Sequence, residues 1–170
     1  YGPSGPPVST EGYEPILSED FTAGKMPPDG WELNQTNLDY TWNNDSTDPY
    51  TEPYCGSCYH DNGTQDEWLI TPSLNFSGYT RIYLHFWWYT SYYEAVHKDY
   101  HDLNVVSSTD GGSNWTLIWN EDNLIEQFKS WQWYDTTFDS PIDLTDYVDE
   151  TDVKIGFQYY SPNGVEGQEY

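Results

Sequence analysis

Short runs of alternating apolar and polar residues, separated by turns, constrain the fold of this chain more than any other feature. The clearest alternation lies in residues 81–89, because successive side chains of an extended segment point to opposite faces. One face of this segment carries Ile82, Leu84, Phe86 and Trp88. Such a run predicts a β-strand with its inner face in the core.

Strand patterns recur along the chain, whereas helix patterns hardly occur. A second clear alternation lies in residues 152–160, and its inner face carries Val153, Ile155, Phe157 and Tyr159. The other predicted strands are residues 16–21, 67–71, 103–108, 115–119 and 131–138. Residues 34–64 are predicted to form long loops, with at most a short strand around Asp39 to Trp42. Residues 121–129 could hold one or two helical turns. Many short strands predict an all-β fold, a two-sheet antiparallel β-sandwich.

The length of 170 residues predicts a single domain with one core. Residues 1–15 are rich in glycine and proline, so they are predicted to form an N-terminal arm. Residues 16–170 are then the single domain. We find no internal repeat, which argues against a β-propeller, because a propeller is built from similar blades.

Acidic residues outnumber basic ones by 29 to 5, which gives a formal net charge of −24. A surface of this charge repels phosphate backbones and anionic lipids, so we expect neither nucleic-acid binding nor membrane insertion. The longest apolar run, residues 82–89, is much shorter than the roughly 20 residues that a membrane-spanning helix needs. Carboxylates favour hard cations, whose ligands are oxygen atoms, so calcium is the expected metal.

Five Asn-x-Ser/Thr sequons predict N-linked glycosylation and an extracellular location, either secreted or at the cell surface. The sequons begin at Asn34, Asn44, Asn62, Asn75 and Asn114. The alternative explanation is that Asn and Thr are abundant because loops favour them.

The segment Cys55-Gly56-Ser57-Cys58 has the spacing of a redox motif, with His60 two residues further on. A thioredoxin-type site would require the pair at the start of a helix, whereas this pair follows a proline- and tyrosine-rich loop. Metal binding by the two cysteines and His60 lacks a fourth ligand nearby. We therefore expect a short disulfide between Cys55 and Cys58 in an oxidising compartment.

No set of catalytic residues can be assembled from the sequence, so no enzyme activity is expected. The spacing of His97 and His101 would suit a transition metal on a helix, but the residues between them give no amphipathic stripe. Paired catalytic carboxylates cannot be distinguished from the many solvated ones.

Two segments resemble secreted jelly-roll modules of the cleaved-adhesin, MAM-like and immune-inhibitor-A-associated (choice-of-anchor) type. Residues 66–78 resemble the segment D-x-W-L-x-T-P-x-L-x-x-S-G of these modules, and residues 107–115 resemble their S-x-D-G-G-x-x-W hairpin. Residues 16–31 resemble the acidic strand and P-x-G-W turn that open them. The resemblance covers residues 16–170 and implies a concanavalin-like or MAM-like jelly roll with a non-catalytic extracellular role.

The hairpin of residues 107–115 also matches the Asp-box turn of sialidases. The Asp110 side chain is expected to bond to nearby backbone amides, Gly111 and Gly112 to adopt positive φ, and Trp115 to close the base of the hairpin. One copy, without an arginine cluster or the context of a tyrosine nucleophile, predicts a hairpin rather than a glycosidase.

Related modules hold a structural calcium ion between the acidic first strand, the loop after the P-x-G-W turn and the final strand. The resemblance places the matching ligands at Glu19, Asp20, Asp39 and Asp45, with a last contribution near or beyond Glu169. The alternative is that loops contain Asn and Asp because these residues favour turns.

The second face of residues 81–89 suggests a function. Tyr83, Trp87 and Tyr89 lie on it and could stack on sugar rings. The alternative is that this face is buried under loops, since strands with two apolar faces are usually central. We therefore expect a non-catalytic extracellular adhesion or carbohydrate-binding module, stabilised by calcium, with glycans or surface proteins as partners.

A second function is a structural subunit of an extracellular surface fibre. Modules of this family close with a further strand, and the sequence reaches Tyr170 where that strand should start. The N-terminal arm, around Val8 to Thr10 or at Ile16 and Leu17, could add the missing strand to another copy. The alternatives are a truncated chain, or a mobile tail with an arm that folds back on its own domain.

Overall fold

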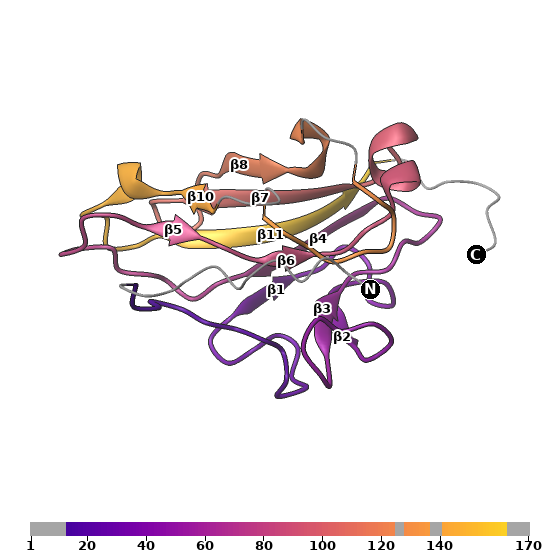
Figure 1. The fold of residues 1–170 in the computed structure, drawn as a ribbon, viewed down its shortest axis with the longest axis horizontal. Coiled ribbons are helices and arrows are strands. Elements are labelled where there is room, and N and C mark those ends of the chain that lie inside the picture. Colours follow the sequence, from indigo (N-terminus) through magenta and orange to yellow (C-terminus); the bar gives the residue numbers. More distant parts are fainter. Residues whose placement is uncertain (1–12, 125–127, 137–140, 163–170) are drawn as a thin grey trace.

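The computed structural model describes residues 13–124, 128–136 and 141–162, and this part of the chain is all-β. The main sheet has five strands in the order β1-β4-β11-β7-β8, and every neighbouring pair is antiparallel. These strands are β1 (Glu32–Asn34), β4 (Gln65–Ile70), β11 (Lys154–Ser161), β7 (Asp102–Ser108) and β8 (Thr116–Asn120). β11 runs through the middle of this sheet (Figure 1).

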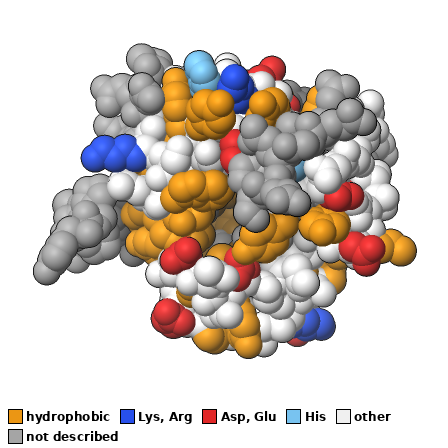
Figure 2. All heavy atoms as spheres, turned by 90° about the vertical axis from the view of Figure 1, so that its right-hand side faces the viewer, with side chains coloured by type: hydrophobic (Ala, Val, Ile, Leu, Met, Phe, Trp, Pro, Cys, Tyr) orange, Lys and Arg blue, Asp and Glu red, His pale blue; other side chains and the backbone are white. Residues whose placement is uncertain are grey.

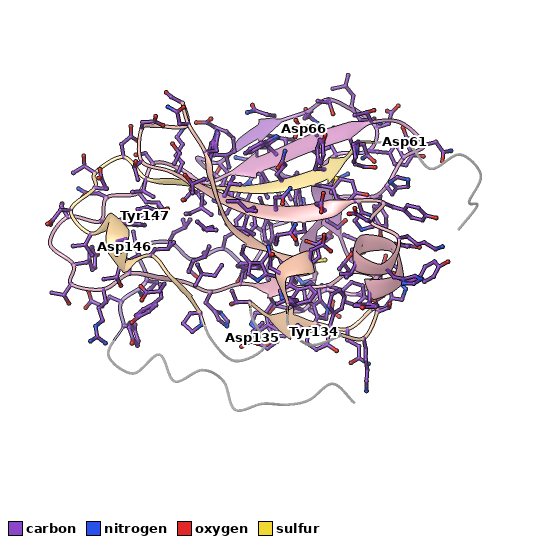
Figure 3. The ribbon with its side chains drawn as sticks, turned by 90° about the horizontal axis from the view of Figure 1, so that it is seen from above. Asp61, Asp66, Tyr134, Asp135, Asp146 and Tyr147 are labelled. Atoms are coloured by element: carbon purple, nitrogen blue, oxygen red, sulfur yellow. The ribbon has the colours of Figure 1, made fainter. Side chains whose placement is uncertain are left out.

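A second layer is built from the segment that the sequence predicts as the clearest strand. Its ladder is broken into β5 (Tyr83–Leu84), which pairs with β10 (Ile142–Asp143), and β6 (Trp87–Trp88), which pairs with β9 (Tyr134–Asp135). Figure 3 shows Asp66 on the side of the main sheet, with Tyr134 and Asp135 on the opposite side of the molecule.

The core lies between these two layers, and both predicted inner faces are confirmed. Ile82 and Trp88 of the second layer are buried together with Val153 and Ile155 of the segment that forms β11. Leu84, Phe86 and Phe157 are partly buried against the same core. The apolar alternation of both segments therefore fixes which side of each strand faces inward.

Residues 34–64 contain a short ladder that the sequence does not predict. β2 (Asn43–Asp45) and β3 (Cys55–Ser57) pair antiparallel below the edge of the main sheet (Figure 1). Three short helices complete the described part: η1 (Tyr93–His97), η2 (Glu121–Asn123) and η3 (Thr145–Tyr147). η2 confirms a helical turn inside the predicted range 121–129, of which residues 125–127 lie outside the described part.

The predicted strand over residues 16–21 is wrong. The Glu19 carboxylate accepts the backbone N–H of Phe21 at 2.6 Å, and the Asp20 carboxylate accepts that of Thr22 at 3.0 Å. Phe21 also has a positive φ of 60°. Acidic side chains that bond to amides two residues further on form turns in place of strand pairing.

The chain from Tyr13 onward lies on its own domain. The Tyr13 ring meets Tyr83 edge to face at 5.7 Å between centroids, and Ile16 packs against the core. Residues 1–12, which include the proposed exchange segment Val8 to Thr10, lie outside the described part, as do residues 163–170 at the other end. In the described part, no helix is long and apolar enough to cross a membrane.

Candidate binding cleft

A large cleft is lined by residues of both layers. Its volume is about 1960 Å³. The floor is formed by side chains of the main sheet, among them Leu69, Phe157 and Tyr159, and the walls come from β5, β6 and the segments 13–21 and 45–60. Because the second layer is narrow, loops rather than strands close this side of the molecule, and they leave a concave site.

One wall of the cleft is a group of five aromatic side chains, which we call the aromatic wall: Tyr50, Trp87, Tyr89, Trp131 and Trp133. Tyr50 stacks on Trp87 with 4.1 Å between ring centroids and an angle of 16°. Tyr89 lies 5.3 Å from Trp133 and 5.6 Å from Trp131. Each ring therefore touches another, so the wall is a continuous apolar surface.

The aromatic wall remains accessible although loops lie on it. The exposed fraction is 49% for Tyr50, 56% for Trp131 and 38% for Trp87. The Trp133 indole N–H donates to the Asp48 carbonyl at 3.0 Å, which fixes that ring against the loop. The predicted alternative, a face buried under loops, therefore does not hold for Trp87.

Trp131 is held in an unusual backbone conformation. Its φ is +60°, a region that bulky residues rarely adopt, and its backbone N–H donates to the Thr90 carbonyl at 3.0 Å. A large apolar side chain that is exposed and held in a strained conformation is more typical of a binding surface than of a passive turn.

The sequence identifies part of this site. Tyr83, Trp87 and Tyr89 all line the cleft, but Tyr83 lies apart from the aromatic wall and packs on Tyr13. Tyr50 and Trp133 come from distant segments, which meet Trp87 only in the folded chain. Sequence reasoning could have found Trp131 and Trp133 only from the density of tryptophan in residues 131–133.

Carboxylates dominate the charge of the cleft. Asp45, Asp48 and Glu94 are among its lining residues, and Arg81 is the one arginine or lysine in the described lining. Burial, and next the charge of Asp48, raise the pKa of the Tyr89 hydroxyl, so this ring stays neutral. Figure 2 shows one face of the molecule, on which acidic side chains lie among hydrophobic ones and the few basic ones lie near the margins.

Two histidines meet at one end of the cleft. The rings of His60 and His101 have centroids 6.2 Å apart, and His101 stacks on Tyr159 at 5.1 Å. His60 Nδ1 lies 3.2 Å from the Tyr159 hydroxyl. Burial lowers the pKa of both imidazoles, that of His101 to about 4. His97, which ends η1, is exposed and does not join them.

The expected disulfide is not formed in the structure: Cys55 and Cys58 are free thiols. Cys55 begins β3 and Cys58 follows the last residue of this strand, and an extended segment between two cysteines holds their side chains apart. Burial raises the pKa of both thiols, and for Cys58 the nearby Glu67 carboxylate adds to this effect. Neither thiol is therefore activated as a nucleophile.

The four expected calcium ligands do not come together. The Asp20 and Asp45 carboxylates accept hydrogen bonds from Thr22 and Thr47 in two separate turns. In the described part of the chain, the one group of three carboxylates whose oxygens lie within 4.8 Å of one another is Asp99, Asp102 and Asp122. Glu19 and Asp39 are not in it, and the contribution expected near Glu169 lies outside the described residues.

The three carboxylates of Asp99, Asp102 and Asp122 could together hold a cation that prefers oxygen ligands. Burial raises the pKa of Asp102 and of Asp122. Beside them, burial raises the pKa of Glu121 to about 8, and both of its oxygens lie 3.0 Å from the Leu103 backbone N–H.

The Asp-box turn has the expected geometry. Asp110 Oδ1 accepts the backbone N–H groups of Ser113 at 3.0 Å and Asn114 at 2.9 Å. The hydrogen bond from the Asn114 side chain, followed by that from its backbone N–H, holds the Asp110 pKa low, at about 2. Gly111 and Gly112 have φ of 70° and 98°. This turn joins β7 to β8, and its residues do not line the cleft.

The sequon asparagines differ in how available they are. Asn34, Asn62, Asn75 and Asn114 are exposed, whereas Asn44 is half-buried. The Asn114 Nδ2 group donates to Asp110 Oδ2 at 2.6 Å, so a glycan on this nitrogen would remove one donor from the turn. Asn75 Oδ1 accepts the Ser77 backbone N–H at 2.9 Å, which leaves its Nδ2 available.

Comparison of the chain with models of known protein families finds no matching family. Comparison with curated proteins finds no similar sequence either.

Proposed function

We propose that this chain is a non-catalytic extracellular module that binds carbohydrate, in an adhesive or targeting role, through the aromatic wall of its cleft. The observation that carries the proposal is the set of contacting rings, of which Tyr50, Trp87 and Trp131 are exposed to solvent inside a concave site. The apolar faces of pyranose rings pack on aromatic rings. A concave site with few polar groups is the usual form of a small-ligand site.

The charge of the cleft narrows the ligand class. Asp45, Asp48 and Glu94 repel uronic acids, sialic acids and sulfated sugars, and the net charge of −24 extends this repulsion beyond the cleft. Arg81 alone cannot balance these charges. The preferred ligand is therefore an uncharged oligosaccharide.

The fold belonging to this proposal is a two-sheet jelly roll. The main sheet is one layer, and the interrupted pairs β5 with β10 and β6 with β9 are the other. The position of the late strand β11 between β4 and β7 supports such a topology, because a jelly roll places strands that are distant in the sequence side by side.

A glycan array followed by calorimetry tests the function. We expect binding to one or more neutral glycans and none to sialylated or sulfated ones. Replacing Tyr50 by Ala, or Trp131 by Ala, should lower the affinity about 10- to 100-fold, because aromatic anchors of a binding site typically contribute about 1–3 kcal/mol.

Tyr40→Ala is the matched control, since Tyr40 is an exposed tyrosine of the same loop region and does not line the cleft. Its affinity should equal that of the unmodified protein. Preferential binding of anionic glycans, or an equal loss in the Tyr40 variant, would contradict the proposal.

A further inference from the structure

His60 presents a buried nitrogen without a partner. Its Nε2 atom is shielded from solvent and has no hydrogen-bond partner, while its Nδ1 atom lies 3.2 Å from the Tyr159 hydroxyl. When Nδ1–H donates to that hydroxyl oxygen, Nε2 carries a free lone pair. A buried acceptor without a donor requires an explanation, and a bound ion is one of the few available.

A second imidazole lies next to His60. The His60 and His101 centroids are 6.2 Å apart, with an angle of 31° between the rings. A zinc–nitrogen bond is about 2.0–2.1 Å, so each ring centroid lies about 3 Å from a bound ion. Two imidazoles on one ion are therefore about 5 Å apart at a tetrahedral angle, so the observed rings must approach by about 1 Å to share an ion.

The surroundings of the pair favour a cation. The negative charges of Asp61 and Glu94 favour a positive charge at His60, and Glu94 also lines the cleft. Thr90 Oγ1 lies 3.4 Å from His101 Nε2 and is a further polar group at the site.

We propose that His60 and His101 form a site for one first-row transition metal ion such as Zn²⁺, with Tyr159 as the residue that orients His60. Imidazole nitrogens suit Zn²⁺, Cu²⁺ and Ni²⁺, whereas calcium takes oxygen ligands. This site thus differs in its ligand type from the three carboxylates of Asp99, Asp102 and Asp122. The orientation of His60 by its other nitrogen is the usual arrangement at metal sites.

Titration of the full chain with Co²⁺ tests the site without any mutation. The chain contains four histidines, so their imidazoles can be followed individually by NMR after isotope labelling of histidine. In excess Mg²⁺, which occupies carboxylates, we expect one Co²⁺ to shift the signals of His60 and His101 strongly and those of His85 and His97 little. Added Zn²⁺ should reverse the shifts.

Variants then identify the ligands. His60→Ala and His101→Ala should each lower the Co²⁺ affinity at least about 10- to 100-fold, and Tyr159→Phe should lower it by up to this factor, since second-shell partners typically contribute that much. His97→Ala is the matched control and should bind normally. Three results would overturn the proposal: no histidine shifts, equal shifts of all four histidines, or a thiolate-to-cobalt absorption band, which would place the ion on Cys55 and Cys58.

Discussion

Glu121 is an acidic residue in a buried position. Its carboxyl group is almost fully buried, and the backbone N–H of Leu103 lies within hydrogen-bond distance of both oxygens. Burial, with Asp102 and Asp122 nearby, raises its pKa from 4.5 to about 8. At neutral pH the folded protein therefore keeps a proton on this carboxyl group that the unfolded chain loses.

Replacing Glu121 by Gln should make stability less dependent on pH. Because the pKa of Glu121 is higher in the folded than in the unfolded protein, the free energy of unfolding falls as pH rises from about 4.5 to 8. Above pH 8 the buried carboxyl group is ionised and the destabilisation is complete. Gln keeps an acceptor for Leu103 and carries no charge. We expect the variant to melt several degrees above the unmodified protein at pH 9, since about 1 kcal/mol shifts Tm by 2–4 °C in a chain of this size.

At pH 5 the Tm difference between the two proteins should largely disappear. Glu150→Gln, at an exposed position, is the matched control and should show no such pH-dependent gain. A constant Tm difference between pH 5 and pH 9 would show that the Glu121 carboxyl group does not titrate in this window.

At the scale of elements, the turn between β7 and β8 depends on one side chain. Asp110 accepts two backbone N–H groups and the Asn114 side chain, and these bonds hold its pKa at about 2. Asp110→Ala should lower Tm, whereas Asp39→Ala, at an exposed position with no such set of bonds to its carboxylate, should not. Because the folded pKa is depressed, the contribution of Asp110 is present above about pH 4 and is lost as pH falls toward 2. An Asp110 variant that melts like the unmodified protein at pH 7 would refute this role of the turn.

Sequence patterns predict elements whose residues interact locally or share a face. The alternation in residues 152–160 and the Asp-box turn are each contained in one short segment of the sequence, and both predictions are confirmed. The sequence does not predict the pairing of β2 with β3, because both strands are short and polar and a long loop separates them. Glu67 shows the same limit: it is fully buried because its carboxylate accepts the backbone N–H groups of Thr36 and Asn37, which lie 31 and 30 residues earlier.

The aromatic wall and the histidine pair arise only in the assembled molecule. Tyr50, Trp87 and Trp133 come from three segments that the narrow second layer brings to one side of the cleft. His60 and His101 likewise belong to separate segments, so their spacing in the sequence carries no signal for a shared site. Trp87 and Tyr89 can be predicted from the sequence because they lie on one face of one predicted strand, whereas Tyr50 joins them only through the fold.

The whole molecule carries more negative charge than its few ion pairs can offset. Its net charge is −24, and the ion pairs between lysine and acidic side chains in the described part are Lys25 with Asp29 and Lys154 with Glu32. Repulsion between unpaired carboxylates destabilises the compact state, and salt screens it over about 10 Å at 0.1 M. We therefore expect Tm to rise steeply as NaCl is raised from 10 mM to 0.5 M, and a flat or falling Tm over this range would contradict it.

The effect of specific calcium binding on Tm can be distinguished from this general screening by comparing CaCl₂ with NaCl at the same ionic strength. An ion that binds only the native state raises Tm by mass action, beyond what the same ionic strength of NaCl achieves. If the three carboxylates of Asp99, Asp102 and Asp122 bind calcium, a few millimolar CaCl₂ should give this extra rise in Tm and a chelator should remove it. Asp102→Asn should abolish the extra rise, whereas Asp39→Asn, outside the group, should keep it. Equal melting curves in CaCl₂ and in NaCl of the same ionic strength would show that the group is occupied only by its diffuse counterion atmosphere.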